Sequence, residues 1–184
     1  MSGRFIAVVG PSGVGKDSVI DALASRQPGL ERVRRAITRP PEAGGEPFEP
    51  LSEAEFAARA AVGGFLLWWQ AHGLSYGIPA EVCARLEAGE DLLANLSRRV
   101  LGEAAARVPR LTVLHLTAPP EVLATRLAAR RREDAAQIAE RLERRVAPAS
   151  LPPGVPEIVI DNSGPLDRAV QATLAALYPA QAAP

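Results

Sequence analysis

The sequence has few of the residues that mark secreted, metal-rich or membrane-bound proteins. Its single cysteine, Cys83, excludes an internal disulfide and a cysteine-rich metal site, and is typical of a small buried side chain in a reducing compartment. The only early apolar run, Phe5 to Val9, is too short for a signal-peptide core or a membrane span. We therefore expect a cytoplasmic protein that does not bind membranes.

An excess of charge of either sign is also absent. The 184 residues carry 21 basic and 21 acidic side chains, so the formal net charge is +0 at pH 7. This balance gives no basis for broad affinity for nucleic acid, and any anion site has to be built locally. No spacing of histidines, cysteines or carboxylates indicates zinc, and the oligomeric state stays open, with a homodimer as one possibility.

The length and the 47% of hydrophobic residues fit one domain with one sizeable core. We predict this domain over residues 1–178, with 179–184 as a frayed tail. Two parts of it are predicted to be insertions, about 35–79 and about 130–141. Insertions in such folds commonly bind the second substrate and close over the first, so we expect an acceptor-binding segment and a helical lid.

Strand-like and helix-like segments alternate along the chain. Residues 4–10, RFIAVVG, form a β-branched apolar run that ends in glycine, and Ser52 with Glu55 predicts a capping box at the start of a helix. Further strands are predicted at residues 91–96, 111–116 and 157–161, and further helices at 16–26, 120–132, 135–145 and 166–177. This alternation predicts an α/β fold with a parallel sheet flanked by helices.

Residues 10–18, GPSGVGKDS, nearly match the phosphate-binding pattern G-x-x-x-x-G-K-[ST], between the first predicted strand and helix. The glycines allow successive N–H groups to point at phosphate oxygens, and the following helix adds the positive end of its dipole. Lys16 supplies a mobile cation for the transferred phosphoryl group and is a predicted catalytic residue. The predicted ATP-binding residues of this loop are Gly10, Pro11, Ser12, Gly13, Val14, Gly15, Lys16, Asp17 and Ser18.

Asp17 stands where the pattern requires a hydroxyl. A triphosphate repels a carboxylate unless a divalent cation lies between them, so Asp17 is predicted to bind Mg²⁺ or a metal-bound water. Ser18 is the alternative source of the hydroxyl. In a third interpretation Asp17 only favours the first turn of the helix.

The order of several segments resembles the guanylate kinase family over nearly the whole chain. These segments are GPSGVGK (10–16), ITRPPEAG (37–44), FLLWWQAHGLSYGIP (65–79) and RLAARRREDAAQIAERL (126–142). The resemblance implies a P-loop kinase fold, ATP as donor with Mg²⁺, and an acceptor that carries a phosphate. It also implies that Asn162 borders the nucleotide, and that Arg130, Arg132 and Arg141 of the lid act on the transferring phosphoryl group.

Two departures from guanylate kinases concern the acceptor. The family reads guanine with a glutamate and a serine or threonine, where this sequence has Leu67 and Ile78. Neither residue accepts a hydrogen bond, and each unpaired polar group of guanine would cost about 1–3 kcal/mol. The family also has carboxylates at the strand end where Asn95 and Ser97 align, so Asp17 is predicted to restore the missing charge.

The same segments, with N-x-S-R at residues 95–98 and R-x-R-E at 130–133, resemble the ribose 1,5-bisphosphate phosphokinases of phosphonate breakdown. That resemblance implies transfer of phosphate from ATP to ribose 1,5-bisphosphate, a sugar phosphate without a base. The acceptor oxygen is already ionised, so no general base is required and catalysis depends on alignment and charge. Candidate acceptor contacts are Arg35, Arg39, Tyr76, Asn95 and Arg98.

Two alternatives stay open. A nucleoside monophosphate kinase with a changed base preference would use the same fold and loop. A non-catalytic guanylate-kinase-like binding module is less compatible with the intact glycines and Lys16. His115, within a predicted strand, is interpreted as a hydrogen-bonded core histidine, and His72 as a turn residue.

Overall fold

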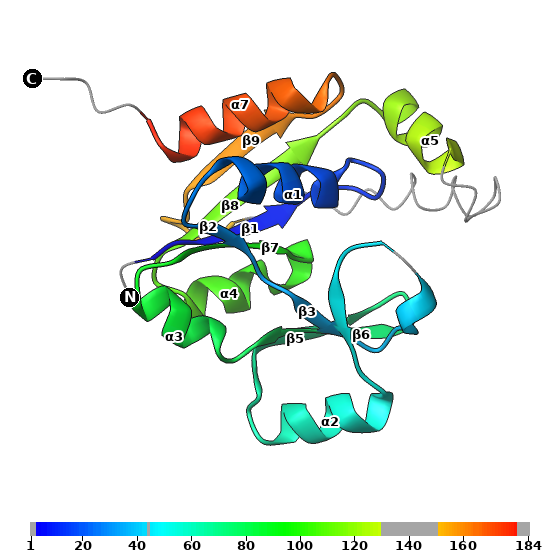
Figure 1. The fold of residues 1–184 in the computed structure, drawn as a ribbon, viewed down its shortest axis with the longest axis vertical. Helices are drawn as coiled ribbons and strands as arrows, with labels where there is room; N and C mark the ends of the chain where they lie inside the picture. Colours follow the sequence, from blue (N-terminus) through cyan, green and yellow to red (C-terminus); the bar gives the residue numbers. More distant parts are fainter. Residues whose placement is uncertain (1–2, 44, 130–150, 180–184) are drawn as a thin grey trace, which may run out of the picture.

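The computed structural model describes residues 3–43, 45–129 and 151–179. Its main sheet has the order β2-β7-β1-β8-β9, and all neighbouring strands are parallel (Figure 1). The strands are β1 (Phe5–Val9), β2 (Leu30–Arg32), β7 (Asp91–Asn95), β8 (Leu111–Thr117) and β9 (Glu157–Asp161). The predicted strands are confirmed. β2 was not predicted, because a strand of 3 residues carries no periodic pattern.

Helices cover both faces of this sheet, as the alternation predicted. On one face lie α1 (Lys16–Arg26) and α7 (Leu166–Leu177), and on the other α3 (Val82–Glu87) and α4 (Leu101–Arg107) (Figure 1). Successive residues of β1 point to opposite faces: Ile6 and Val8 pack with α1 and α7, whereas Phe5, Ala7 and Val9 pack with α3 and α4. Since both faces are covered, β1 is buried along its whole length.

A second, smaller sheet lies beside the first, in the order β4-β3-β6-β5. Its strands are β3 (Arg35–Ile37), β4 (Phe48–Pro50), β5 (Phe65–Ala71) and β6 (Leu74–Pro79), with a short 3₁₀ helix η1 (Pro41–Ala43) and helix α2 (Glu53–Ala61) in the connections. The predicted capping box is present, because Ser52 Oγ accepts from the Glu55 N–H and Glu55 Oε2 accepts from the Ser52 N–H. This sheet packs against the main core through Leu67, Trp69 and Ile78.

The chain order places the functional loops at one edge of the main sheet. The carboxyl ends of β1, β7 and β8 lead into residues 10–15, into the 3₁₀ helix η2 (Arg98–Val100), and towards helix α5 (Pro120–Ala129). Because β1 lies between β7 and β8, the strand order reverses there, and ligands of such sheets bind outside these carboxyl ends. Within the described residues, no helix is long and apolar enough to cross a membrane.

Candidate active site

Residues 10–15 form a tight loop whose backbone only glycine accommodates at two key points. Gly10 has φ of 152° and Gly15 has φ of 90°. A β-carbon on Gly10 would lie 2.5 Å from the carbonyl oxygen of Leu116, and one on Gly15 would lie 2.9 Å from Asn162 Nδ2. Helix α1 then begins at Lys16, with Gly15 as its N-cap, so its first N–H groups face the loop. This geometry is that of an anion-binding helix N-terminus.

Lys16 folds back over this loop. Its Nζ atom donates to the carbonyl oxygens of Gly10 at 2.9 Å and Pro11 at 3.1 Å. Backbone carbonyls are weak partners for an ammonium group compared with phosphate oxygens, so Lys16 is placed to exchange them for a phosphate. The structure thus brings the predicted catalytic lysine and the predicted glycine loop together.

Asn162 forms a hydrogen bond to the phosphate loop. Its side-chain Nδ2 donates to the carbonyl oxygen of Val14 at 2.7 Å, and Arg126 Nη1 donates to the Asn162 carbonyl at 2.8 Å. The residue is buried, and its Oδ1 atom has no hydrogen-bond partner within the described part of the chain. A buried amide oxygen without a donor is rare in proteins, so Asn162 offers an acceptor to a ligand beside the phosphate loop.

Asp17, the unusual residue of the loop, faces the end of β7. Its Oδ1 atom lies 3.3 Å from Arg32 Nη2 and 3.3 Å from Asn95 Nδ2. The side chain is 40% exposed. Ser18, one residue further along α1, is exposed and points about 100° away around the helix. The two predicted metal ligands therefore lie on different sides of α1.

The donor set at Asp17 fits a magnesium–nucleotide complex. Mg²⁺ usually takes one or two carboxylates and completes its octahedron with phosphate oxygens and water. Among the described residues no group of three or more histidine, cysteine or acidic side chains is placed to hold a metal by itself. Asp17 at the phosphate loop provides one accessible carboxylate, which is what such a shared site requires.

Arg39, a predicted acceptor contact, has buried donors without partners in the part of the chain that the structure describes. Its guanidinium carbon lies 4.2 Å from the ring centroid of Phe48. The Nε and Nη2 atoms are buried, and neither has a hydrogen-bond partner among the described residues. A buried guanidinium group with unpaired donors is costly, and a phosphate would satisfy both nitrogens at once.

Arg35 and Tyr76, two further predicted acceptor contacts, lie against each other. The rings of Tyr76 and Trp69 stack with centroids 5.5 Å apart, and the Arg35 guanidinium carbon lies 5.1 Å from the Tyr76 centroid. Arg35 Nη1 donates to the carbonyl oxygen of Asn95 at 2.9 Å, and its Nε and Nη2 donate to the carboxylate of Glu46. These bonds use one N–H of each nitrogen, and the side chain is 7% exposed.

Glu46 and Arg32 were missed by the sequence analysis. Both side chains are almost buried, 6% and 12% exposed, and Arg32 Nη2 donates to Glu46 Oε2 at 3.1 Å. Glu46 lies in the loop before β4 and Arg32 ends the short strand β2, where no periodic pattern marks them. One signal was present: Arg35 lies in a strand that is buried at every residue, and such an arginine requires a carboxylate partner.

Arg98 and His115 are also brought together. Arg98 Nη2 lies 3.0 Å from His115 Nε2, and His115 Nδ1 lies 3.0 Å from Glu157 Oε1. Both ring nitrogens of His115 therefore have partners, as expected for a histidine in a strand. The predicted lid residues Arg130, Arg132 and Arg141 lie outside the described residues.

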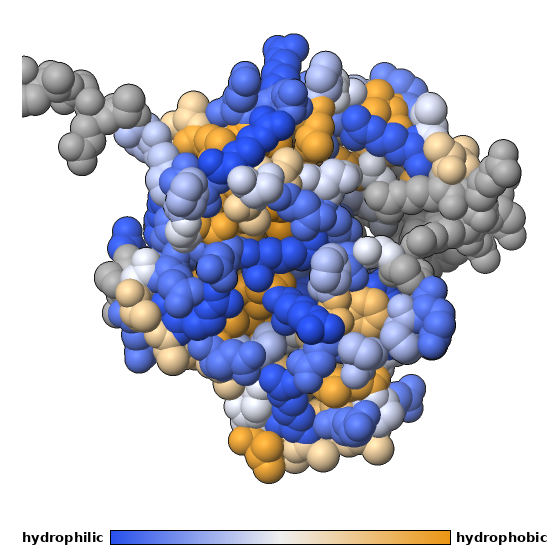
Figure 2. All heavy atoms as spheres, viewed as in Figure 1, coloured by the Kyte–Doolittle hydropathy of each residue, from blue (hydrophilic) through white to orange (hydrophobic). Residues whose placement is uncertain are grey.

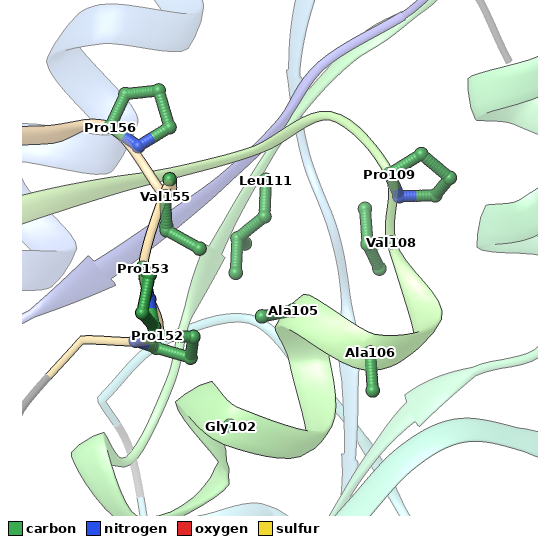
Figure 3. A pocket seen from close by; sticks show the side chains of 11 residues that line it. Gly102, Ala105, Ala106, Val108, Pro109, Leu111, Pro152, Pro153, Val155 and Pro156 are labelled. Carbon is green, nitrogen blue, oxygen red and sulfur yellow. The ribbon is translucent and has the colours of Figure 1, made fainter.

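A hollow at the opposite edge of the sheet is excluded as a phosphate site (Figure 3). It lies between α4 and residues 152–156, close to Leu111, which pairs with Phe5 at the amino end of β1. The side chains that line it are all uncharged and apolar, and they offer no cation to a phosphate.

Comparison with known proteins places the chain in a family. A ribose 1,5-bisphosphate phosphokinase PhnN from Ruegeria sp. (strain TM1040) is 51% identical over 169 residues, which cover 91% of this chain and 88% of that protein. A protein of the same name from Pseudomonas fluorescens (strain SBW25) is 47% identical and covers 96% of each chain. The chain belongs to the ribose 1,5-bisphosphate phosphokinase family. No model of a protein family matches it.

Relatives of this family also occur within longer proteins. A bifunctional ribose 1,5-bisphosphokinase-thymidine phosphorylase from Cupriavidus necator is 48% identical over 90% of this chain, which spans only 28% of that protein. Among solved structures, guanylate kinase from Anaplasma phagocytophilum matches with a TM-score of 0.66 at 17% identity, over 98% of this chain and 88% of that one. A gluconokinase from Sinorhizobium meliloti 1021 matches with a TM-score of 0.52 at 22% identity, over 96% and 91%. These likenesses confirm the predicted fold.

Leu67 and Ile78, the two residues at which this family member departs from guanylate kinases in the acceptor-binding segment, are buried and apolar. Leu67 and Ile78 are cross-strand partners in β5 and β6, and both are 0% exposed. They pack in the same core cluster as Leu96 and Val100, which follow β7. No polar side chain is presented at either position, so the structure has apolar core where a base-reading pair would stand.

Proposed function

We propose that this chain transfers the γ-phosphoryl group of ATP to the 1-phosphate of ribose 1,5-bisphosphate, giving 5-phospho-α-D-ribose 1-diphosphate and ADP. An oxygen of the 1-phosphate attacks the γ-phosphorus, and the bond from that phosphorus to the β,γ-bridging oxygen breaks. The attacking oxygen is ionised at neutral pH, so no proton has to be removed. What remains for the protein is alignment of the two substrates and neutralisation of charge.

One contrast on the acceptor side carries this proposal. Arg39 holds two buried guanidinium nitrogens that lack partners among the described residues, whereas Leu67 and Ile78 are apolar and fully buried. The acceptor side thus offers strong donors to a phosphate and no hydrogen bond to a base at those two positions. A sugar bisphosphate satisfies both conditions, and a nucleotide would leave its base edge unpaired.

On the donor side, residues 10–15 and the first turn of α1 would bind the ATP phosphates through backbone N–H groups. Lys16 would leave the carbonyl oxygens of Gly10 and Pro11 and take up an oxygen of the transferring phosphoryl group. When bound, Mg²⁺ would neutralise part of the phosphate charge, and Asp17 is the carboxylate proposed to hold it, with Ser18 as the alternative. Asn162 Oδ1 is proposed to accept a hydrogen bond from the nucleotide.

On the acceptor side, Arg39 is proposed to bind one phosphate of the sugar, with Tyr76 beside it. Asn95, which ends β7, and Arg98, which begins η2, are proposed to orient the attacking phosphate. Arg35 is proposed to contribute through the N–H groups that Glu46 and Asn95 leave over. The arginines Arg130, Arg132 and Arg141 are proposed to neutralise the transition state from the lid.

The test is a transfer assay with the purified chain, Mg²⁺, ATP and a panel of acceptors: ribose 1,5-bisphosphate, GMP, AMP and dTMP. We expect ADP to form only with the sugar bisphosphate, and ³¹P NMR to show a new diphosphate at the sugar's 1-position. Faster turnover of GMP than of the sugar would refute the proposal, since Leu67 and Ile78 would then not exclude guanine.

A Lys16→Met variant controls for contaminating kinases. It removes the cation while leaving the loop glycines in place, so the product should fall to background with every acceptor. Product formation at the wild-type rate in this variant would assign the activity to a contaminant.

A further inference from the structure

A charge cluster with a nearly buried centre connects the phosphate-loop helix to the small sheet. Arg32 lies at its centre: its guanidinium group forms ion pairs with Asp17 at 3.3 Å, with Glu46 at 3.1 Å, and with Asp21. The arginine is 12% exposed, Glu46 is 6% exposed, and Asp21 is 57% exposed. Figure 2 shows hydrophilic residues in a band across the middle of this face, at the level of β2 and β3.

Glu46 is the deepest member and holds two arginines together. Its Oε2 atom accepts from Arg32 Nη2 at 3.1 Å and from Arg35 Nε at 3.1 Å, and its Oε1 atom accepts from Arg35 Nη2. Without this carboxylate, two nearly buried guanidinium groups would face each other with no charge between them. Glu46 therefore holds Arg32 from the side of the small sheet, and Asp21 holds it from the side of α1.

Arg32 in turn determines where the Asp17 carboxylate lies. The hydrogen bonds of Asp17 within the described residues both go to Oδ1, from Arg32 and from Asn95, each at 3.3 Å. Arg32 is charged, because a guanidinium group is not deprotonated in proteins, and Asp21, Asp17 and Glu46 are its anionic partners. A fixed cation beside Oδ1 orients the carboxylate so that Oδ2 is presented away from Arg32.

We propose that Arg32 is a positioning residue that orients Asp17 for the metal–nucleotide complex, and that Glu46 aligns Arg32 for this role. The inference rests on the proposed function, in which Asp17 holds the metal. It also ties that carboxylate to the acceptor side, because Glu46 and Arg35 belong to the small sheet and its loops, and Arg35 lies against Tyr76 and Trp69. Outer partners that orient a metal ligand typically affect metal affinity or activity by about 10–100-fold.

The test is a double-mutant cycle between Arg32→Gln and Asp17→Asn. Two quantities are measured for each variant: the affinity for Mg²⁺ in the presence of a non-hydrolysable ATP analogue, by calorimetry, and kcat with ribose 1,5-bisphosphate. We expect Arg32→Gln to weaken Mg²⁺ binding and lower kcat by about tenfold or more. In the Asp17→Asn background the same change should add less than about threefold, because Arg32 acts through Asp17.

Arg26→Gln is the control. It removes an arginine at the far end of the same helix, whose ion pair with Asp167 is exposed and does not involve Asp17 or Arg32, and we expect less than about a twofold change in either quantity. Glu46→Gln should weaken Mg²⁺ binding in the same direction as Arg32→Gln, and Arg32→Lys should restore part of the affinity by restoring the charge. Thermal unfolding of each variant separates loss of metal affinity from loss of fold.

The outcomes distinguish the positioning role from the function. Two results would overturn the positioning role while the sugar kinase activity stands. One is that the effects of Arg32→Gln and Asp17→Asn multiply fully in the double variant. The other is that Arg32→Gln lowers the stability and leaves the Mg²⁺ affinity unchanged. Absence of sugar phosphorylation in the wild type, with the calorimetric cycle as expected, would overturn the proposed substrate and keep the positioning role. If Arg32→Gln unfolds the chain, Arg32→Lys and Glu46→Gln carry the same comparison.

Discussion

Replacing Arg39 with methionine should stabilise the ligand-free protein and at the same time remove most of its activity. Both effects follow from the guanidinium group, whose Nε and Nη2 atoms are buried without partners among the described residues. Each such group costs about 1–3 kcal/mol, whereas the attraction to the Phe48 ring at 4.2 Å returns about 0.5–2 kcal/mol. Methionine is apolar and flexible enough to fill the space. Two such groups cost about 2–6 kcal/mol and the ring contact returns about 0.5–2 kcal/mol, so we expect a net gain of about 0–5.5 kcal/mol, centred near 3 kcal/mol, in the free energy of unfolding.

The assay is thermal unfolding with and without ribose 1,5-bisphosphate, together with steady-state kinetics. For a chain of this length, each kcal/mol gained should raise Tm by about 2–4 °C. The sugar bisphosphate should raise Tm of the wild type but not of Arg39→Met. Loss of two charge-assisted hydrogen bonds, about 3 kcal/mol or more, should lower kcat/KM by roughly 10²-fold or more.

Arg59→Met is the matched control for this prediction. Arg59 also lies over an aromatic ring, Phe65 at 4.9 Å, but Glu49 accepts from its Nη1 at 2.9 Å and the Gly64 carbonyl from its Nε at 3.3 Å. Its loss should therefore lower Tm and leave KM for the sugar unchanged. A lower Tm for ligand-free Arg39→Met, or an unchanged KM in that variant, would refute the reasoning about unpaired donors.

Three further predictions concern the loop and the carboxyl-terminal helix. Gly15→Ala should cost about 1–2 kcal/mol of stability and weaken binding of an ATP analogue in calorimetry, because φ is 90° and the new β-carbon would lie 2.9 Å from Asn162 Nδ2. Burial raises the pKa of Asp91, but hydrogen bonds from Arg4 and Tyr178 outweigh burial and lower it. The charged carboxylate therefore stabilises the fold above its unfolded pKa of about 4, and this contribution is lost as the pH falls through the lowered folded value. In urea unfolding, the stability difference between wild type and Asp91→Asn should be full above about pH 4 and vanish at lower pH. Burial and the hydrogen bond to Asp91 raise the pKa of Tyr178 to about 12. The contribution of the neutral hydroxyl to the free energy of unfolding should therefore be complete below pH 10 and lost as the pH passes about 12, and Tyr178→Phe should abolish this pH dependence.

Four strands of the main sheet could be predicted from the sequence because they are apolar runs between helical patterns, whereas β2 has only 3 residues. The segments 157–161 and 166–177 agree residue for residue with β9 and α7. The small sheet could not be predicted in the same way, since β3 and β4 have 3 residues each and show no alternation. Their pairing is non-local, with β3 held between β4 and β6, and local patterns carry no information about it.

The candidate site likewise has a part that could be predicted from the sequence and a part that could not. The phosphate loop and Lys16 follow from a contiguous motif with a known physical role, and the family follows from the motifs around it. Arg32 and Glu46 belong to no motif, and they matter because folding brings them to Asp17 and Arg35. The resemblance identified Leu67 and Ile78 as departures from guanylate kinases. The structure adds that Leu67 and Ile78 pair across β5 and β6 and are 0% exposed, so neither residue is available for a contact with a base.

The contacts of Asp17 with Asn95 and Arg32 together explain why the phosphate loop has an aspartate. Guanylate kinases have carboxylates at the end of the strand that corresponds to β7, where this chain has Asn95. A second carboxylate at Asn95 would face Asp17 within hydrogen-bond distance, and the two like charges would raise the pKa of one and weaken its hold on a cation. An amide at that position donates instead, from Nδ2 to Asp17 Oδ1 at 3.3 Å. Arg32 supplies a compensating positive charge at the same distance. With a carboxylate in place of the loop hydroxyl and an amide at the strand end, one carboxylate lies at the phosphate loop and is oriented by two donors.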